Sequence, residues 1–203
     1  MSSIDSKAFR NFTYGLFVIT AKDGEKDNGC ITNTAIQIAD TPACISVSLN
    51  KNGLTHDMIL KTGKFNLSFL TESAPMKVFQ HFGFQSGRDI NKFAECEVTM
   101  RTENGIIYVP KYTNTIVSGN VIQTIDRGSH TLFIASVDET IILNNEKSCS
   151  YSYYFEHIKP KPEQTEKHGW RCKICGYVHE DSELPADFVC PICKHGAEYF
   201  EKI

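Results

Sequence analysis

The chain carries near its C-terminal end the stretch Trp170-Arg171-Cys172-Lys173-Ile174-Cys175-Gly176-Tyr177, followed after a polar loop by Phe188-Val189-Cys190-Pro191-Ile192-Cys193. Its two Cys-x-x-Cys pairs can place four thiolates around one tetrahedral metal ion. The segment is about 35 residues long, and domains of that size usually need a metal or disulfides to fold. We therefore predict a small C-terminal module built around a metal site of Cys172, Cys175, Cys190 and Cys193.

The four ligands leave the identity of the metal open. A tetrahedral site of four sulfurs suits either iron or zinc. In a zinc ribbon the ion only holds the chain together, and zinc is the more common occupant of such double pairs. Iron in the same ligands can accept and release one electron.

The surroundings of the ligands resemble a rubredoxin of the short-loop kind. The resemblance rests on Gly176-Tyr177 after the second cysteine, on the Cys-Pro-Ile-Cys pair, and on the flanking aromatic residues Trp170, Phe188, Tyr199 and Phe200. It implies an Fe(Cys)4 centre inside a small apolar core of these aromatics. Members of that family often have glycine after the fourth cysteine. This chain has Lys194 there, at a turn that needs a permissive backbone.

Composition limits the function classes. A chain of 203 residues holds one ordinary domain and a small module, and 41% hydrophobic residues are enough for a real core. A net charge of -3 argues against nucleic-acid and membrane partners, which need a basic face. Acidic residues outnumber basic ones within 170–203, which counts against a DNA-binding ribbon.

The cysteines and the chain start indicate a compartment. The first residues lack the apolar run of a signal peptide, and no stretch is long enough to span a bilayer. Free thiols together with a thiolate metal site predict a reducing, cytoplasmic location. The cysteines outside the metal motif have no regular spacing, and we expect buried apolar residues rather than redox thiols at Cys30, Cys44, Cys96 and Cys149.

The region before the metal module predicts a mainly β fold. Apolar and β-branched runs predict strands at 16–20, 43–49, 64–70, 98–102, 106–109, 115–126 and 130–143. Helical spacing and capping signals predict helices at 4–13, 55–61 and 74–82. Since the helices do not alternate with the strands, as a doubly wound α/β fold requires, we predict an antiparallel barrel with a few helices.

A polar segment separates the barrel from the metal module. Residues 156–168 include Pro160 and Pro162 and few apolar residues, which predicts a semi-extended linker. The predicted division is a barrel domain at 1–155, a linker at 156–168 and the metal module at 169–203.

Two polar stretches of the barrel are candidates for ligand binding. The chain contains neither a Rossmann fingerprint nor a P-loop, so its function has to come from another cofactor site or from surface groups. Residues 28–37 gather hydrogen-bonding side chains beside Gly29. Residues 46–56 leave a strand through Asn-Lys-Asn-Gly and enter a helix, which is a plausible phosphate cradle. The pattern alone favours a hairpin edge and a capped polar turn.

The order of these segments resembles the flavin reductase family, the FMN-binding split β-barrels. The resemblance spans about residues 9–138 and includes, in order, 15–20, 28–34, 46–56, 63–67, 82–89 and 128–135. It implies a homodimer with FMN near the subunit interface and the nicotinamide of NAD(P)H stacked on the flavin ring.

The resemblance also implies residue roles. It places three residues along the isoalloxazine and ribityl side of FMN: Thr32, Asn33 and Thr34. It assigns the ribityl chain and the phosphate to Ser48, Asn50, Lys51 and Thr55. Arg88 approaches the phosphate or the partner subunit. His130 lies near the nicotinamide as a candidate catalytic residue, although it could also simply begin a surface strand. The other histidines, His56 among them, show no pattern that separates them from surface or capping residues.

A flavin reductase barrel joined to a rubredoxin module resembles the high-molecular-weight rubredoxins. This resemblance implies a path from NAD(P)H through FMN and iron to a downstream redox protein, a flavodiiron protein that reduces O₂ or NO. Three alternatives stay open. One is a flavin or ferric reductase with a structural zinc ribbon, and another is a non-catalytic electron carrier with flavin and iron. The third, which the acidic module favours least, is a regulatory DNA-binding ribbon.

Overall fold

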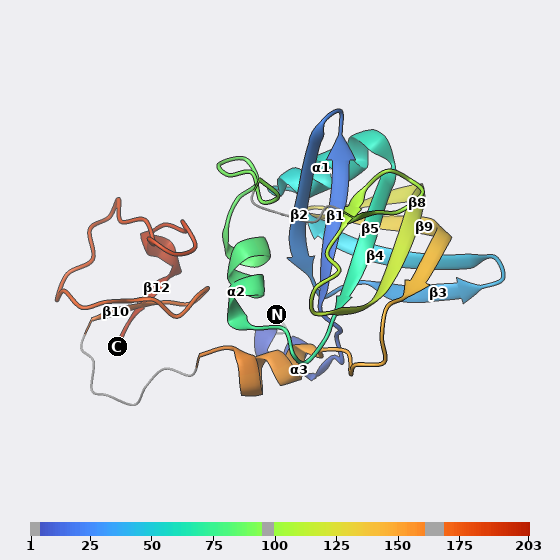
Figure 1. Ribbon diagram of the computed structural model, residues 1–203. Helices are drawn as coiled ribbons and strands as arrows, with labels where there is room; N and C mark the ends of the chain where they lie inside the picture. Colours follow the sequence, from blue (N-terminus) through green and yellow to red (C-terminus); the bar gives the residue numbers. More distant parts are fainter. Residues whose placement is uncertain (1–4, 95–99, 161–168) are drawn as a thin grey trace.

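The computed structural model describes residues 5–94, 100–160 and 169–203, and its largest element is a seven-stranded antiparallel sheet (Figure 1). The strand order is β2-β1-β5-β8-β9-β4-β3. The strands are β1 (Phe17–Asp23), β2 (Lys26–Thr32), β3 (Ile36–Asp40), β4 (Ala43–Asn50), β5 (Lys64–Leu70), β8 (Thr113–Arg127) and β9 (His130–Ile142).

The two edges of this sheet belong to consecutive strands. β2 and β3 stand at opposite ends of the strand order, yet only residues 33–35 join them. The sheet must therefore curl round until its edges approach each other, which makes a barrel that is split between β2 and β3. We call this opening, with its connection 33–35, the seam. The predicted antiparallel barrel is confirmed.

The barrel interior is filled from several strands and one helix. On strand β4, Ile45, Val47 and Leu49 belong to the core, because every second side chain of a strand points to the same face. Gly119 on β8 gives the fully buried Phe65 ring its space, because a Cβ at this glycine would lie 2.5 Å from the ring.

The helix α1 (Leu54–Thr62) confirms the predicted helix and lies against β1 (Figure 1). Gly63 ends it in the left-handed conformation, φ 73°, and its N–H bonds the carbonyl of Ile59. The predicted N-terminal helix is instead a 3-10 segment, η1 (Ser6–Asn11). Its expected apolar face is not buried, since Phe9 and Phe12 are 52% and 60% exposed.

A second apolar cluster fills the space below the barrel. It combines Leu16, Leu70 and Tyr154 with the short helix α2 (Met76–Phe79) and the π-helical turn η2 (Gln80–Phe84), which together form the predicted helix at 74–82. The elements α3 (Tyr151–Tyr153) and η3 (Tyr154–Ile158) follow the barrel. The first residues of the predicted linker are therefore part of a helical turn.

Two predicted strands are shorter than expected. Only β6 (Met100–Arg101) and β7 (Ile107–Tyr108) form, as a separate two-stranded ladder. The remainder of the predicted strand at 98–102 partly lies outside the described residues, as does Cys96. Among the residues described, no helix combines the length and the apolar character needed to cross a membrane.

The C-terminal module has its own small sheet, ordered β11-β10-β12. Its elements are β10 (Trp170–Cys172), β11 (Val178–His179), η4 (Ala197–Tyr199) and β12 (Phe200–Lys202). The module lies on the α2 side of the barrel, away from β3 (Figure 1).

Candidate metal centre and flavin site

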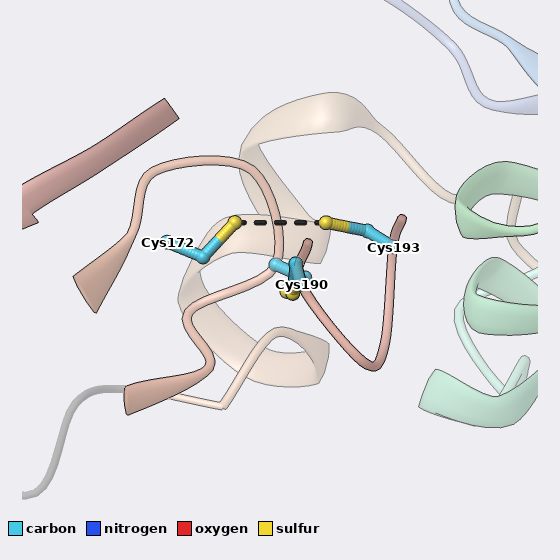
Figure 2. Close-up of side chains that lie close together, drawn as sticks. Cys172, Cys190 and Cys193 are labelled. Atoms are coloured by element: carbon cyan, nitrogen blue, oxygen red, sulfur yellow. Dashed lines mark hydrogen bonds between the residues drawn. The ribbon is translucent and has the colours of Figure 1, made fainter. Parts of the chain in front are cut away.

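The four cysteines of the module converge on one point. Their sulfur atoms all lie within 4.8 Å of one another. The sulfurs of Cys175 and Cys190 are 3.5 Å apart, as are those of Cys172 and Cys193, which Figure 2 shows facing each other. Four sulfurs bound tetrahedrally at about 2.3 Å from one ion are about 3.8 Å apart. The predicted ligand set is therefore assembled with a spacing that suits one metal ion.

The two Cys-x-x-Cys turns have the same backbone design. In the first, the Gly176 N–H bonds the Cys172 carbonyl at 2.9 Å, and the Cys172 N–H bonds the Tyr177 carbonyl at 2.8 Å. In the second, Lys194 and Cys190 make the equivalent bonds, at 2.9 and 2.8 Å. Gly176 and Lys194 both have positive φ, 82° and 60°. The turn that the sequence identified as unusual thus keeps its geometry with a lysine in a conformation that favours glycine.

Apolar side chains surround the cysteines. Cys172, Cys190 and Cys193 are at most 4% exposed and cluster with Phe200. Trp170, Tyr177 and Phe188 pack on this cluster, as the resemblance to a rubredoxin implied. Tyr199 differs from the expectation, because it is 39% exposed and makes an edge-to-face contact with the His195 ring instead of joining the core.

Two of the thiols, Cys175 and Cys193, need a cation to stay ionised in this environment. Burial raises the pKa of Cys175 to about 11, and it also raises the pKa of Cys193. Burial acts in the same direction on Cys190, but backbone N–H groups of Cys193 and Ile192 outweigh it and lower the pKa of that thiol. Metal binding at neutral pH must therefore release protons from this site.

At the seam, the structure brings together four predicted flavin residues. Thr34 donates its hydroxyl hydrogen to the Ser48 carbonyl at 2.7 Å and accepts the Ser48 N–H at 3.1 Å. Thr32, buried at the end of β2, lies 3.2 Å from the Thr34 hydroxyl. The half-buried side chain of Asn33 between them has no hydrogen bond to any described residue, so it can bind a ligand.

A second group of predicted residues lies where β4 meets the turn between β8 and β9. Asn50 is directly opposite His130 in the sheet register, and the Lys51 N–H bonds the Ser129 carbonyl at 3.0 Å. The Lys51 ammonium is paired with Asp126 on β8. His130 shares a 2.8 Å hydrogen bond with the Ser129 hydroxyl through Nδ1.

Arg88 is connected to this region through two residues that the sequence did not single out. Its guanidinium donates to Asp57 at 2.6 Å, and the His56 Nδ1 donates to the same carboxylate at 2.9 Å. The His56 Nε2 lies 2.8 Å from the Thr131 hydroxyl on β9. Hydrogen bonds from His56 and Arg88 hold the pKa of Asp57 below its usual value.

His56 is therefore not the surface or capping residue that the sequence suggested. Its side chain is buried and both ring nitrogens are hydrogen-bonded. Thr55 beside it is also buried and accepts a 2.9 Å bond from Asn28 of β2. The only sequence signal was the position of His56 three residues after Gly53, which ends the polar turn before α1.

The cysteines outside the module are consistent with apolar roles where they are described. Cys44 and Cys149 are buried and Cys30 is half-buried, and all three are free thiols. Burial raises the pKa of Cys149 to about 11, which keeps this thiol protonated at neutral pH.

Comparison with known proteins defines the class. The flavin reductase like domain family matches residues 9–161, and the rubrerythrin, rubredoxin-like domain family matches residues 170–201. The chain is thus an oxidoreductase of the flavin reductase class that carries a rubredoxin-like, iron-binding module.

Individual relatives identify the family within this class. A high molecular weight rubredoxin from Moorella thermoacetica is 34% identical over 230 aligned positions, which cover 98% of this chain and 100% of that protein. A ferric-chelate reductase (NAD(P)H) from Archaeoglobus fulgidus is 29% identical over 80% of this chain and 95% of its own. This chain belongs to the high molecular weight rubredoxin family.

The barrel fold is shared with solved structures. The NADH:FAD oxidoreductase SgcE6 of Streptomyces globisporus, solved with NAD and FAD fragments, superposes with a TM-score of 0.65. The match covers 75% of this chain and 93% of that chain, at 18% identity. At this identity the comparison supports the fold alone.

Proposed function

We propose that this chain transfers electrons from NAD(P)H, through FMN bound at the seam, to the iron of the C-terminal module and then to a protein acceptor. One observation carries the proposal: a flavin reductase barrel and an assembled four-cysteine centre are parts of one chain. Flavin accepts a hydride and releases single electrons, which suits an iron centre that takes one electron at a time.

The barrel residues would divide the work of holding FMN. The free amide of Asn33 and the hydroxyls of Thr32 and Thr34 would bind the ring and ribityl side. Lys51 and Arg88 would bind the phosphate. Both are now in exposed ion pairs with aspartates, and such pairs contribute only about 0–1 kcal/mol, so exchanging them for a phosphate costs little.

Asn50, Ser48 and Thr55 complete the proposed phosphate and ribityl side, and His130 would contact the nicotinamide as the catalytic residue. His130 is half-buried beside Asn50, and its Nε2 has no hydrogen bond to the described residues. It can therefore donate or accept a bond at the place where the substrate would enter.

The protein acceptor would dock on the exposed side of the metal module. Val189 and Ile192, next to the second pair of cysteines, are 53% and 41% exposed. An apolar surface beside the ligands fits a short-lived contact with a redox partner. For the identity of that partner we propose a flavodiiron protein reducing O₂ or NO, on the family resemblance alone.

We also propose a homodimer in a reducing, cytoplasmic environment, with the chain divided at 1–155, 156–168 and 169–203. All five residues of the edge strand β3 are exposed, including Ile36 and Ile38, and Ile122 of β8 is 60% exposed. An apolar sheet edge of this kind favours association unless it is covered. The free thiols of the described cysteines suit a reducing compartment.

The test is the visible spectrum of the purified protein with analysis of its bound groups. The expected result is a ferric thiolate spectrum superimposed on flavin absorbance, with FMN released by heat and about one iron per chain. Recovery of FAD only, or of no flavin from folded protein, would contradict the flavin assignment. A spectrum of flavin alone, with zinc in the module, would contradict the relay.

That last outcome would support the second candidate, a flavin or ferric reductase with a structural zinc ribbon. The resemblance of the barrel to the Archaeoglobus ferric-chelate reductase favours this alternative over a non-catalytic carrier. The zinc-ribbon alternative predicts that a ferric chelate is reduced directly, at the rate of flavin reduction. It also predicts that changes in the module do not affect this rate.

A further inference from the structure

The module makes a specific contact with the barrel through one side chain. Phe84, the last residue of η2, is half-buried and packs against the apolar cluster of Cys172, Cys190, Cys193 and Phe200. The green ribbon of α2 and η2 lies on the Cys193 side of the metal site in Figure 2. A barrel residue thus takes part in the core that surrounds the metal.

The turn that carries Phe84 has two apolar sides. Phe82, two residues earlier, is 6% exposed and belongs to the cluster below the barrel, where it packs on Phe93. Phe84 belongs to the cluster of the module. The segment therefore joins two cores, and its π-helical form is a local irregularity of the kind that is frequent at functional sites.

Buried hydrogen bonds fix this turn to β2. The Lys92 ammonium, in a side chain that is 4% exposed, donates to the Phe82 carbonyl at 3.0 Å and to the Gly29 carbonyl of β2 at 2.9 Å. Gly83 lies so close to β2 that a Cβ on it would be 3.3 Å from Ile31. Burying an ammonium is costly unless it makes strong hydrogen bonds. The position of η2 is therefore defined relative to β2.

The strand β2 leads directly into the seam. Thr32 ends it, and Asn33 and Thr34 follow, which are the residues proposed to line the flavin ring. The turn that carries Phe84 contacts β2 at Gly29 and Ile31, and the proposed flavin residues begin at Thr32. The same short part of β2 therefore connects Phe84 with the proposed flavin residues.

We propose that Phe84 is the anchor by which the metal module docks on its own barrel, and that it positions the iron for electron transfer from the flavin. This inference rests on the proposed function. In this transfer, reduced flavin gives one electron to ferric iron, which becomes ferrous. NAD(P)H supplies the hydride that reduces the flavin. Phe84 is a barrel residue that packs within the apolar cluster around the cysteines, so it gives the module a defined point of contact with the barrel.

The first test measures docking without any electron transfer. Trp170 is the only tryptophan of the chain and lies in the module, so its fluorescence anisotropy decay reports on module rotation. In the full-length protein with zinc in place of iron and without flavin, we expect the wild-type module to rotate with the barrel. Phe84→Ala should add a fast rotational component, and Phe84→Leu should largely restore the slow one.

A matched control is Phe12→Ala, which truncates a 60% exposed phenylalanine of the barrel outside the module cluster. It should leave the decay unchanged. A wild-type module that already rotates independently, or a Phe84→Ala variant with an unchanged decay, would overturn the docking proposal.

The second test uses the protein with FMN and iron in a stopped-flow spectrometer. Phe84→Ala should slow the loss of ferric absorbance several-fold, while bleaching of flavin by NAD(P)H keeps its rate. Equal iron reduction in Phe84→Ala and wild type would overturn the positioning role. If wild-type iron is not reduced at all, the proposed function fails, but the anisotropy result still decides docking.

Discussion

Lys194 is the residue at which the two cysteine turns of the metal site differ. Both turns need a left-handed residue after the second cysteine, and the first uses Gly176 while the second uses lysine at φ 60°. An L-residue with a side chain adopts this conformation at a cost of about 1–2 kcal/mol. The turn tolerates it because two backbone hydrogen bonds define its geometry.

Lys194→Gly should therefore stabilise the module, by about 1 kcal/mol after the loss of glycine entropy in the unfolded chain. The measurement is the denaturant midpoint for loss of the ferric absorbance. Lys173→Gly is the matched control, because Lys173 lies in the first turn and does not have positive φ. That variant should be less stable than wild type. A lower midpoint for Lys194→Gly would contradict the strain argument.

Lys51 is a second residue with a defined test. If it binds the FMN phosphate, Lys51→Ala removes one charge-assisted hydrogen bond, worth about 1.5–3 kcal/mol. The dissociation constant of FMN, measured by flavin fluorescence, should rise about tenfold or more. Asp126→Asn removes the present partner of Lys51 and should bind FMN at least as tightly as wild type. Unchanged affinity in Lys51→Ala would exclude this contact.

Asp57 gives a pH-dependent prediction. Its pKa is lower in the folded chain than the unfolded value of about 3.9, so the stabilisation is present above that pH and is lost as pH falls through the folded value. The flavin-free Asp57→Asn variant should melt below wild type at neutral pH, and the difference should narrow near pH 3. A difference that stays the same at both pH values would show that the carboxylate charge is not involved.

At the scale of elements, local patterns predicted the strands and helices whose apolar residues are buried in the barrel. The predicted strand at 64–70 and the helix at 55–61 agree with β5 and α1 within one residue at each end. The predicted N-terminal helix is a 3-10 segment instead, and the residues that the structure describes leave Phe9 and Phe12 exposed. Spacing shows which residues share a face, but only the tertiary structure determines whether that face is buried.

The same limit applies to the site. The four cysteines were predictable because metal-ligand spacing is local in sequence. His56 and Lys92 were missed, since their burial depends on partners far along the chain, Thr131 for one and Gly29 for the other. The residues proposed for the flavin site come from family resemblance, because the sequence pattern alone favoured ordinary turns.

The edge strand β3 leads to a prediction about assembly. If a second copy covers its exposed isoleucines, Ile36→Lys places a charge in that interface and should convert the dimer to a monomer in light scattering. Ile142→Lys is the matched control, because Ile142 is 77% exposed at the far end of β9. A wild-type protein that is monomeric and still binds FMN would contradict the proposed dimer.

The whole molecule combines two folding units of different kinds. The barrel has a core of its own from six elements, whereas the module folds around its metal ligands. Removing the metal should therefore unfold the small unit and leave the large one. This difference allows the direction of electron flow to be tested with one substitution.

Cys193→Ser removes one of the four thiolates, at a position that is 4% exposed and 3.5 Å from the Cys172 sulfur. The iron should be lost or distorted and the module largely unfolded, while FMN still binds with the stoichiometry of wild type. NAD(P)H should bleach the flavin at close to the original rate, but reduction of a protein acceptor should collapse. In wild type, stopped-flow traces should show flavin bleaching no later than the loss of ferric absorbance. Iron that is reduced before flavin, or a Cys193→Ser protein that passes electrons on undiminished, would show that the module is structural and not part of the electron path.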